Sequence, residues 1–216
     1  MMRILHVSCS PRGQISESYR LSRKIIEFLL EREPAAIVVD RVIGTGAISH
    51  IDESYATALG GIQQSSAERF PEGAMARSEE LIQELESSDC MVIGTPMHNF
   101  AVPSALKAWI DHIVRVRCTF NATKDGYKGI LRDRPVYVAV SSGGRYSGGR
   151  ARQPNFLTPY IKTVLGVIGL SDVTFFSVEG SSLGPQAVTE ARAGADRALR
   201  EHFSPSCAPV SPARIA

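Results

Sequence analysis

The sequence predicts a single α/β domain built on a doubly wound, five-stranded parallel sheet with helices on both faces. Three observations lead to this prediction. Short apolar runs alternate with helical segments along the whole chain, which is the pattern of repeated βα units. The third run, residues 90–95, is almost wholly apolar, as expected for a central strand covered on both sides. Turn-forming residues follow the first, third and fourth runs directly, so these strands end abruptly.

The predicted strands are apolar or β-branched runs that stop at turn-forming residues. The second run is partly polar, as suits an edge strand. Pro135 has no N–H to donate to a ladder, so the fourth strand begins immediately after it. In chain order, the predicted strands cover residues 3–8, 37–42, 90–95, 136–140 and 173–178.

Each predicted helix carries a stripe of apolar side chains. In the first, Leu21, Ile25 and Leu29 recur at intervals of four residues, which places them on one face. Pro103 and Pro185 are suited to the first turn of a helix, where a missing N–H costs nothing. The predicted helices cover residues 18–33, about 77–87, a segment from Pro103, about 159–168, and a last segment opened by Gly184-Pro185.

Three further segments show no regular pattern. Residues 43–76 and 116–133 are longer than ordinary loops, and we expect them to cover a site or a dimer contact. Residues 204–216 contain three prolines and three serines, so we expect a disordered tail after a domain that spans residues 1–203.

Composition excludes several classes of function. Apolar residues make up 44% and charged residues 21%, and the net charge is only +2, so we expect neither a nucleic-acid nor a membrane partner. No apolar stretch is long enough to span a membrane, and the start of the chain lacks a signal-peptide pattern, which predicts a cytoplasmic protein. The four cysteines form no C-x-x-C pair, so we expect reduced thiols and no metal site.

In an open parallel sheet, ligands bind at the carboxyl ends of the strands, where the loops after strands one, three and four meet. The first loop contains Ser10, Ser16 and Ser18 and leads into a helix, whose free amides favour a phosphate. The alternative is that these serines only cap the helix. The loop has neither the P-loop pattern nor G-x-G-x-x-G.

The second and third loops suit a flat heteroaromatic ligand. Met97 and Phe100 would pack against a ring, and Asn99 would meet its polar atoms. His98 could polarise a substrate or be an ordinary solvated or packed side chain. The loop 141–144 offers hydroxyls and glycines that let the backbone approach a ring closely.

The run Pro96-Met97-His98-Asn99-Phe100 resembles the P-M-Y-N-F loop of the bacterial FMN-dependent NADH-azoreductases, which are flavodoxin-like NAD(P)H:quinone oxidoreductases. The resemblance covers nearly the whole chain and implies a flavodoxin-like sheet of order 2-1-3-4-5. Similar segments also occur at Ser10, Ser16-Glu17-Ser18, Thr119-Phe120, Ser141-Ser142-Gly143-Gly144, Thr158-Pro159-Tyr160, Leu165-Gly166-Val167-Ile168-Gly169, Val178-Glu179-Gly180 and Gly184-Pro185.

The resemblance implies a non-covalent FMN and a homodimer. Candidate substrate contacts are His98, Arg145 and Phe120, the last as an aromatic wall near the subunit boundary. The chain departs from the family with His98 for a usual Tyr, Ser142 for a common Arg and Arg145-Tyr146 for an apolar-His pair, which affects substrate preference more than FMN binding. The implied cofactor residues are Ser10, Ser16, the Glu17 backbone and Ser18 for the phosphate, and Met97, His98, Asn99, Phe100, Ser141, Ser142, Gly143 and Gly144 for the ring.

The resulting hypothesis is a ping-pong enzyme in which the flavin carries the hydride and no protein acid, base or nucleophile is needed. NADH or NADPH would be the donor, and a quinone, azo or nitro compound the acceptor. A flavodoxin-type carrier of single electrons is the main alternative, but such carriers are usually strongly acidic and this chain is nearly neutral. A hydrolase using Ser10 or Cys9 ranks last, because no G-x-S-x-G elbow accompanies them.

Overall fold

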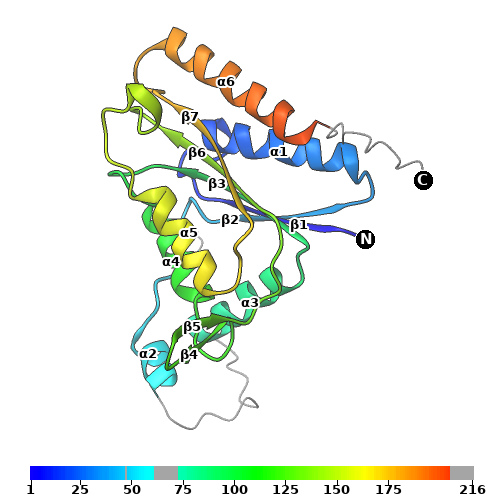
Figure 1. Ribbon diagram of the computed structural model, residues 1–216. Coiled ribbons are helices and arrows are strands. Elements are labelled where there is room, and N and C mark those ends of the chain that lie inside the picture. The colour runs from blue at the N-terminus through cyan, green and yellow to red at the C-terminus, as the bar shows by residue number, and fades with distance from the viewer. Residues whose placement is uncertain (47, 61–72, 205–216) are drawn as a thin grey trace, which may run out of the picture.

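The computed structural model of the chain describes residues 1–46, 48–60 and 73–204. Its centre is a five-stranded parallel sheet of order β2-β1-β3-β6-β7 (Figure 1). This is the expected flavodoxin-like order 2-1-3-4-5, counted over the strands of this sheet. The strands are β1 (Arg3–Ser8), β2 (Ile37–Val42), β3 (Cys90–Pro96), β6 (Val136–Ser142) and β7 (Val173–Glu179).

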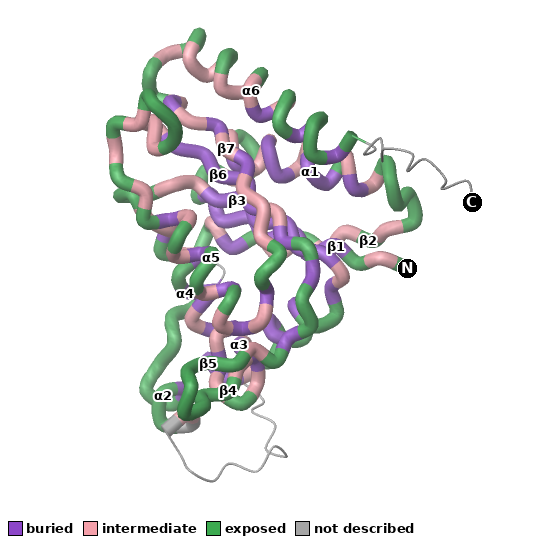
Figure 2. Tube along the Cα trace, in the orientation of Figure 1, coloured by how far each residue is buried: buried purple, intermediate pink, exposed green. Residues whose placement is uncertain are grey.

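Helices cover both faces of the sheet, as predicted. On one face lie α1 (Glu17–Arg32) and α6 (Pro185–Phe203) (Figure 1). On the other face lie α3 (Gly73–Glu86), α4 (Ser104–Ile113) and α5 (Leu157–Val167). The inner strands β1, β3 and β6 and the inner faces of the helices are buried, whereas the edge strands β2 and β7 are partly exposed (Figure 2).

The sheet separates two apolar cores because side chains alternate along each strand. In β3, Met91 and Ile93 pack into the core under α3, α4 and α5, which also contains the buried Trp109. Cys90 and Val92 point to the opposite core, under α1 and α6. This two-sided burial explains why β3 reads as a continuous apolar run.

The two long segments predicted as non-regular each contain regular structure, so that prediction was wrong for the described parts. In the first, α2 (Glu53–Gly60) is capped by Asp52, whose carboxylate accepts a hydrogen bond from Tyr55 N at 2.8 Å. In the second, β4 (Phe120–Thr123) and β5 (Gly126–Gly129) form an antiparallel hairpin. Residues 61–72 and the predicted tail from 205 onward lie outside the described residues.

Several helix boundaries differ slightly from the prediction. Helix α3 starts at Gly73, four residues before the predicted start. Helix α5 starts at Leu157, because the side chain of Asn155 accepts a hydrogen bond from Thr158 N at 3.1 Å. Pro103 is the residue before the first turn of α4 and its carbonyl accepts from Lys107 N. No helix in the described part of the chain combines the length and apolar character needed to cross a membrane.

Candidate functional site

Strand pairing brings the three predicted loops to one edge of the sheet. Because β3 pairs with β1 on one side and β6 on the other, the loops that follow these strands emerge next to one another. Backbone hydrogen bonds hold them there, from Cys9 N to Gly94 O at 2.9 Å and from Met97 N to Ser141 O at 2.7 Å. Phe156 N donates to Phe100 O at 2.9 Å and joins the segment after β6 to the loop after β3.

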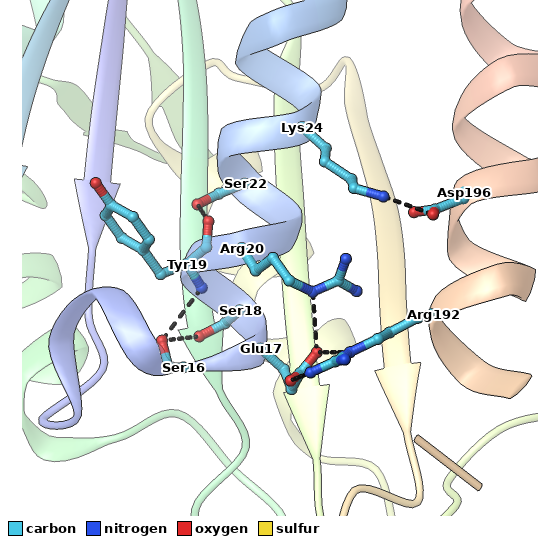
Figure 3. A network of polar contacts seen from close by, with 9 residues as sticks. All are labelled: Ser16, Glu17, Ser18, Tyr19, Arg20, Ser22, Lys24, Arg192 and Asp196. Atoms are coloured by element: carbon cyan, nitrogen blue, oxygen red, sulfur yellow. Dashed lines mark hydrogen bonds and ion pairs between the residues drawn. The ribbon is translucent and has the colours of Figure 1, made fainter. Parts of the chain in front are cut away.

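The loop after β1 is organised by two serines. Ser10 accepts hydrogen bonds from Gly13 N at its carbonyl and from Arg12 N at its hydroxyl. The hydroxyl of Ser16 accepts from Tyr19 N at 3.2 Å, donates to Gly13 O and lies 3.4 Å from the hydroxyl of Ser18 (Figure 3). Ser16 therefore caps α1, and its role in holding a phosphate stays a prediction. Capping by Ser16 leaves the other backbone amides in the first turn of α1 without a hydrogen-bond acceptor inside the helix. Binding of an anion is therefore still favoured there.

Glu17 is the first residue of α1, and its side chain turns toward α6. Arg192 binds both carboxylate oxygens, with Nε 3.0 Å from Oε2 and Nη2 on Oε1, and Arg20 Nε lies 3.2 Å from Oε2 (Figure 3). The hydrogen bond from Arg192 is the main reason that the pKa of Glu17 is lowered. The side chain is thus held as a carboxylate against Arg192 of α6.

The loop after β3 contains a strained turn. His98 and Ala101 pair through two backbone hydrogen bonds, and the two residues between them have positive φ, 47° at Asn99 and 67° at Phe100. This is the signature of a type I′ turn, which glycine and asparagine adopt easily and a bulky residue such as phenylalanine rarely does. Strain of this kind clusters at functional sites. His98, Asn99 and Phe100 are exposed, and Met97 is half-buried.

The loop after β6 packs against two other segments. Gln153 Nε2 donates to Ser142 Oγ at 3.2 Å and lies 3.1 Å from Met97 Sδ. A Cβ on Gly143 would lie 2.7 Å from Ser182 Oγ, and one on Gly144 would overlap Gln153 Oε1. A side chain at either glycine would therefore displace the side chain of Ser182 or Gln153, and the approach of both glycines to a ring stays a prediction.

Large apolar side chains surround this edge of the sheet. Ile15, Phe156 and Leu183 are 75%, 61% and 60% exposed, and Phe100 is 44% exposed. They come from four different segments, namely the loops after β1, β3, β6 and β7. All four follow strands at the carboxyl edge of the sheet, which makes this edge a candidate binding surface.

Two of the candidate substrate contacts lie elsewhere. Phe120 is in the β4–β5 hairpin and packs edge-on against Tyr127. Figure 1 draws this hairpin at the far end of α4 and α5 from the three loops. Arg145 lines a cavity of about 450 Å³ between α6 and the segment after β6, together with Arg150 and Arg197. Within this chain, therefore, the structure brings neither side chain to Met97–Phe100, whereas His98 lies in that loop.

One buried polar group escaped the sequence analysis. His6 Nδ1 lies 2.6 Å from Asp40 Oδ1, and its Nε2 lies 2.9 Å from Ser22 Oγ, an arrangement like a Ser-His-Asp triad. Ser22 is fully buried, however, and donates to Tyr19 O, so a substrate has no access to it. The two hydrogen bonds of His6 connect α1 and β2 to β1. Cys9 is also buried, which raises its thiol pKa and makes it a poor nucleophile.

His6 predicts a pH dependence of stability. Burial lowers its pKa in the folded protein, against the opposing effect of Asp40. The unfolded chain therefore takes up the proton first, and we expect the free energy of unfolding to fall as the pH drops below about 6.5, the usual histidine pKa. Urea unfolding at pH 7.5 and 5.5 measures this fall. His6→Gln should lose most of it, and an unchanged pH dependence in that variant would contradict the assignment.

Comparison with known proteins identifies relatives across almost the whole chain. The family model described as flavodoxin-like fold matches residues 2–203. FMN-dependent NADH:quinone oxidoreductase 5 of Burkholderia lata is 46% identical over 192 residues, 89% of this chain and 92% of the relative. FMN-dependent NADH:quinone oxidoreductase 4 of Pseudomonas fluorescens is 43% identical over 188 residues, 87% of this chain and 89% of the relative.

Solved structures share the fold. An azoreductase from Bacillus anthracis superimposes with a TM-score of 0.79 at 21% identity, covering 94% of this chain and 99% of its own. An FMN-dependent NADH-azoreductase from Bacillus anthracis, solved in complex with FMN, gives a TM-score of 0.75 at 23% identity, covering 94% of this chain and 100% of its own. At these identities, the likeness concerns the arrangement of the elements.

Proposed function

Because the chain belongs to the flavodoxin-like fold family and, within it, to the FMN-dependent NADH:quinone oxidoreductases, we propose that it binds FMN and reduces quinones or azo compounds with NADH. The relatives' activity supports the reaction. The observation on this structure that supports the site is the edge formed by the loops after β1, β3 and β6, where a capped helix start adjoins exposed apolar side chains.

The residues of the first loop fit the phosphate of FMN. The donors are neutral: the hydroxyls of Ser10 and Ser18 and the amides of Glu17 and Ser18 at the start of α1. The hydroxyl of Ser16 donates to Gly13 O and would have to turn to donate to a phosphate. The one acidic side chain among them, Glu17, is held away by Arg192. A set of amides and hydroxyls at a helix start, without a free negative charge, is the usual composition of a phosphate site.

The residues of the second and third loops fit the flavin ring. Met97 and Phe100 offer apolar contact, and Asn99 offers an amide for the polar edge of the ring. The hydrogen bond from Met97 N to Ser141 O fixes the second loop against the third. The strained turn at Asn99 and Phe100 holds these side chains outward, where a flat ring can cover them.

FMN supplies the hydride chemistry when bound, and the chain's residues supply orientation and a dry surface. We propose that donor and acceptor use the same exposed apolar surface in turn, which gives ping-pong kinetics. NADH is the donor in the relatives' names, and use of NADPH stays open. His98 is exposed next to Asn99 and is the residue of this loop best placed to contact the acceptor.

We propose further that the active unit is a homodimer in the cytoplasm, where NADH is available. Phe120 is too far from the loops of its own chain to form an aromatic wall there, so that role requires a second copy. The exposed rings of Phe100 and Phe156 give such a copy an apolar surface to cover.

Steady-state kinetics test the proposed function. The protein reconstituted with FMN should oxidise NADH in the presence of benzoquinone or an azo dye, with parallel double-reciprocal plots. A flavodoxin-type carrier would instead bind FMN but show no NADH oxidation with either acceptor, and it would take up reducing equivalents from dithionite in two separate one-electron steps. A protein that takes up no FMN would contradict both functions.

Phe100→Gly separates the structural role of the strained turn from its contact role. The change creates Asn-Gly, the preferred sequence of a type I′ turn, so we expect the free energy of unfolding to rise by about 0.5 to 1 kcal/mol. Loss of the exposed ring should weaken FMN binding several-fold. Urea unfolding and fluorescence titration with FMN check the two effects, and a less stable variant would show that Phe100 is not strained.

A further inference from the structure

The phosphate end of the proposed FMN site carries a negative charge of its own. Glu17 stands at the first position of α1, where a carboxylate interacts well with the helix dipole. A phosphate bound to the amides at the start of α1 would be repelled by that carboxylate if its charge were not offset. The site therefore needs a positive charge that offsets Glu17, and the nearest candidates are on α1 itself and on α6.

Two arginines supply this charge. Arg192 of α6 reaches across to bind both oxygens of Glu17, and Arg20 binds one of them from the next turn of α1 (Figure 3). Two guanidinium groups and one carboxylate leave this cluster with one net positive charge. Nη2 of Arg20 is buried and has no hydrogen-bond partner among the described residues, so part of that charge is not satisfied within the protein.

We propose that Arg192 is a positioning residue for the cofactor: by pairing with Glu17 it keeps the amino end of α1 net positive and so strengthens the binding of the FMN phosphate. The inference rests on the proposed function. Arg192 does not need to touch the phosphate, because it acts through Glu17 and through the field at the start of α1.

A purely mechanical role is the competing explanation, since Arg192 also connects α6 to α1. The same two helices are joined by a second ion pair, Lys24 Nζ to Asp196 Oδ2 at 2.5 Å, seven residues further along α1 (Figure 3). Lys24→Gln combined with Asp196→Asn removes this link without changing the net charge near the cluster, because one charge of each sign is lost. It is therefore the matched control for a mechanical effect.

Flavin titration of the apoprotein tests the proposal. Quenching of flavin fluorescence gives the dissociation constant for FMN and for riboflavin, which has the same ring but no phosphate. Arg192→Gln should weaken FMN binding by about tenfold at low salt, because a unit charge near a bound anion has an effect of this size. It should leave riboflavin binding nearly unchanged. The Lys24→Gln and Asp196→Asn double variant should affect neither ligand.

A charge-restoring variant decides between the two roles. Glu17→Gln combined with Arg192→Gln keeps Arg20 as the one net positive charge, so FMN affinity should return to near the wild-type value. Arg192→Lys should also retain it. The proposal is overturned if Arg192→Gln binds FMN as well as the wild type does, or if the double variant stays as weak as the single one. A wild-type protein that binds neither flavin contradicts the proposed function itself.

Discussion

Ser16→Asp is expected to abolish most of the FMN affinity while leaving the fold intact. Aspartate caps helices as well as serine does, so it should still accept the hydrogen bond from Tyr19 N. Its negative charge, however, would lie beside the bound phosphate. Two unit charges about 5 Å apart repel by roughly 3 kcal/mol at an effective dielectric constant of about 20, which weakens FMN binding by at least 100-fold.

Ser16→Asn is the uncharged control for this substitution. It has nearly the same shape as aspartate and also caps well, so FMN affinity should fall less than about tenfold, and the melting temperatures of both apoproteins should stay close to the wild type. Fluorescence titration measures the affinities. If the two variants bind FMN equally well, the phosphate is not at the start of α1.

Gly44→Ala should disturb the same loop from the opposite side. A Cβ at Gly44 would overlap the carbonyl group of Ser10 and lie 2.9 Å from the carbonyl carbon of Cys9. Because these neighbours are backbone atoms, the loop must shift. We expect the free energy of unfolding to fall by about 1 to 3 kcal/mol, as for other overpacked sites, and FMN binding to weaken with it.

The control for Gly44→Ala is the same substitution at Gly149. A Cβ there meets nothing within 4 Å, so stability should change by less than about 0.5 kcal/mol. Urea unfolding and FMN titration of the two variants should differ clearly. A Gly44→Ala protein as stable as Gly149→Ala would show that the loop after β1 is not packed as described.

The central sheet is the part of the fold that the sequence predicts best. The run at residues 3–8 matches β1, and that at 37–42 matches β2, because strand composition and turn-forming residues coincide there. The hairpin β4–β5 was missed although Asp125-Gly126 is a hairpin signal, since the surrounding residues are too polar to read as strands. The start of α2 has a similar local signal in Asp52.

The sequence predicts only those features of the candidate site that depend on residues close together in the chain. Ser16 and Met97 were predicted as site residues because they lie in loops that directly follow strands, and that assignment stays a prediction. The pairing of Glu17 with Arg192 spans 175 residues and that of His6 with Asp40 spans 34, and no periodicity or motif connects them. The positive φ of Phe100 also has no signal in its residue type, because it is imposed by the pairing of His98 with Ala101.

An anaerobic spectral titration tests the central claim most directly. The protein reconstituted with FMN should lose its yellow absorbance on addition of one equivalent of NADH, and one equivalent of benzoquinone should restore it. The same two additions to the Ser16→Asp variant, at the same FMN concentration, should show no protein-bound flavin to bleach. A wild-type protein that binds FMN but is not bleached by NADH, or is not recoloured by any quinone or azo dye, would contradict the account.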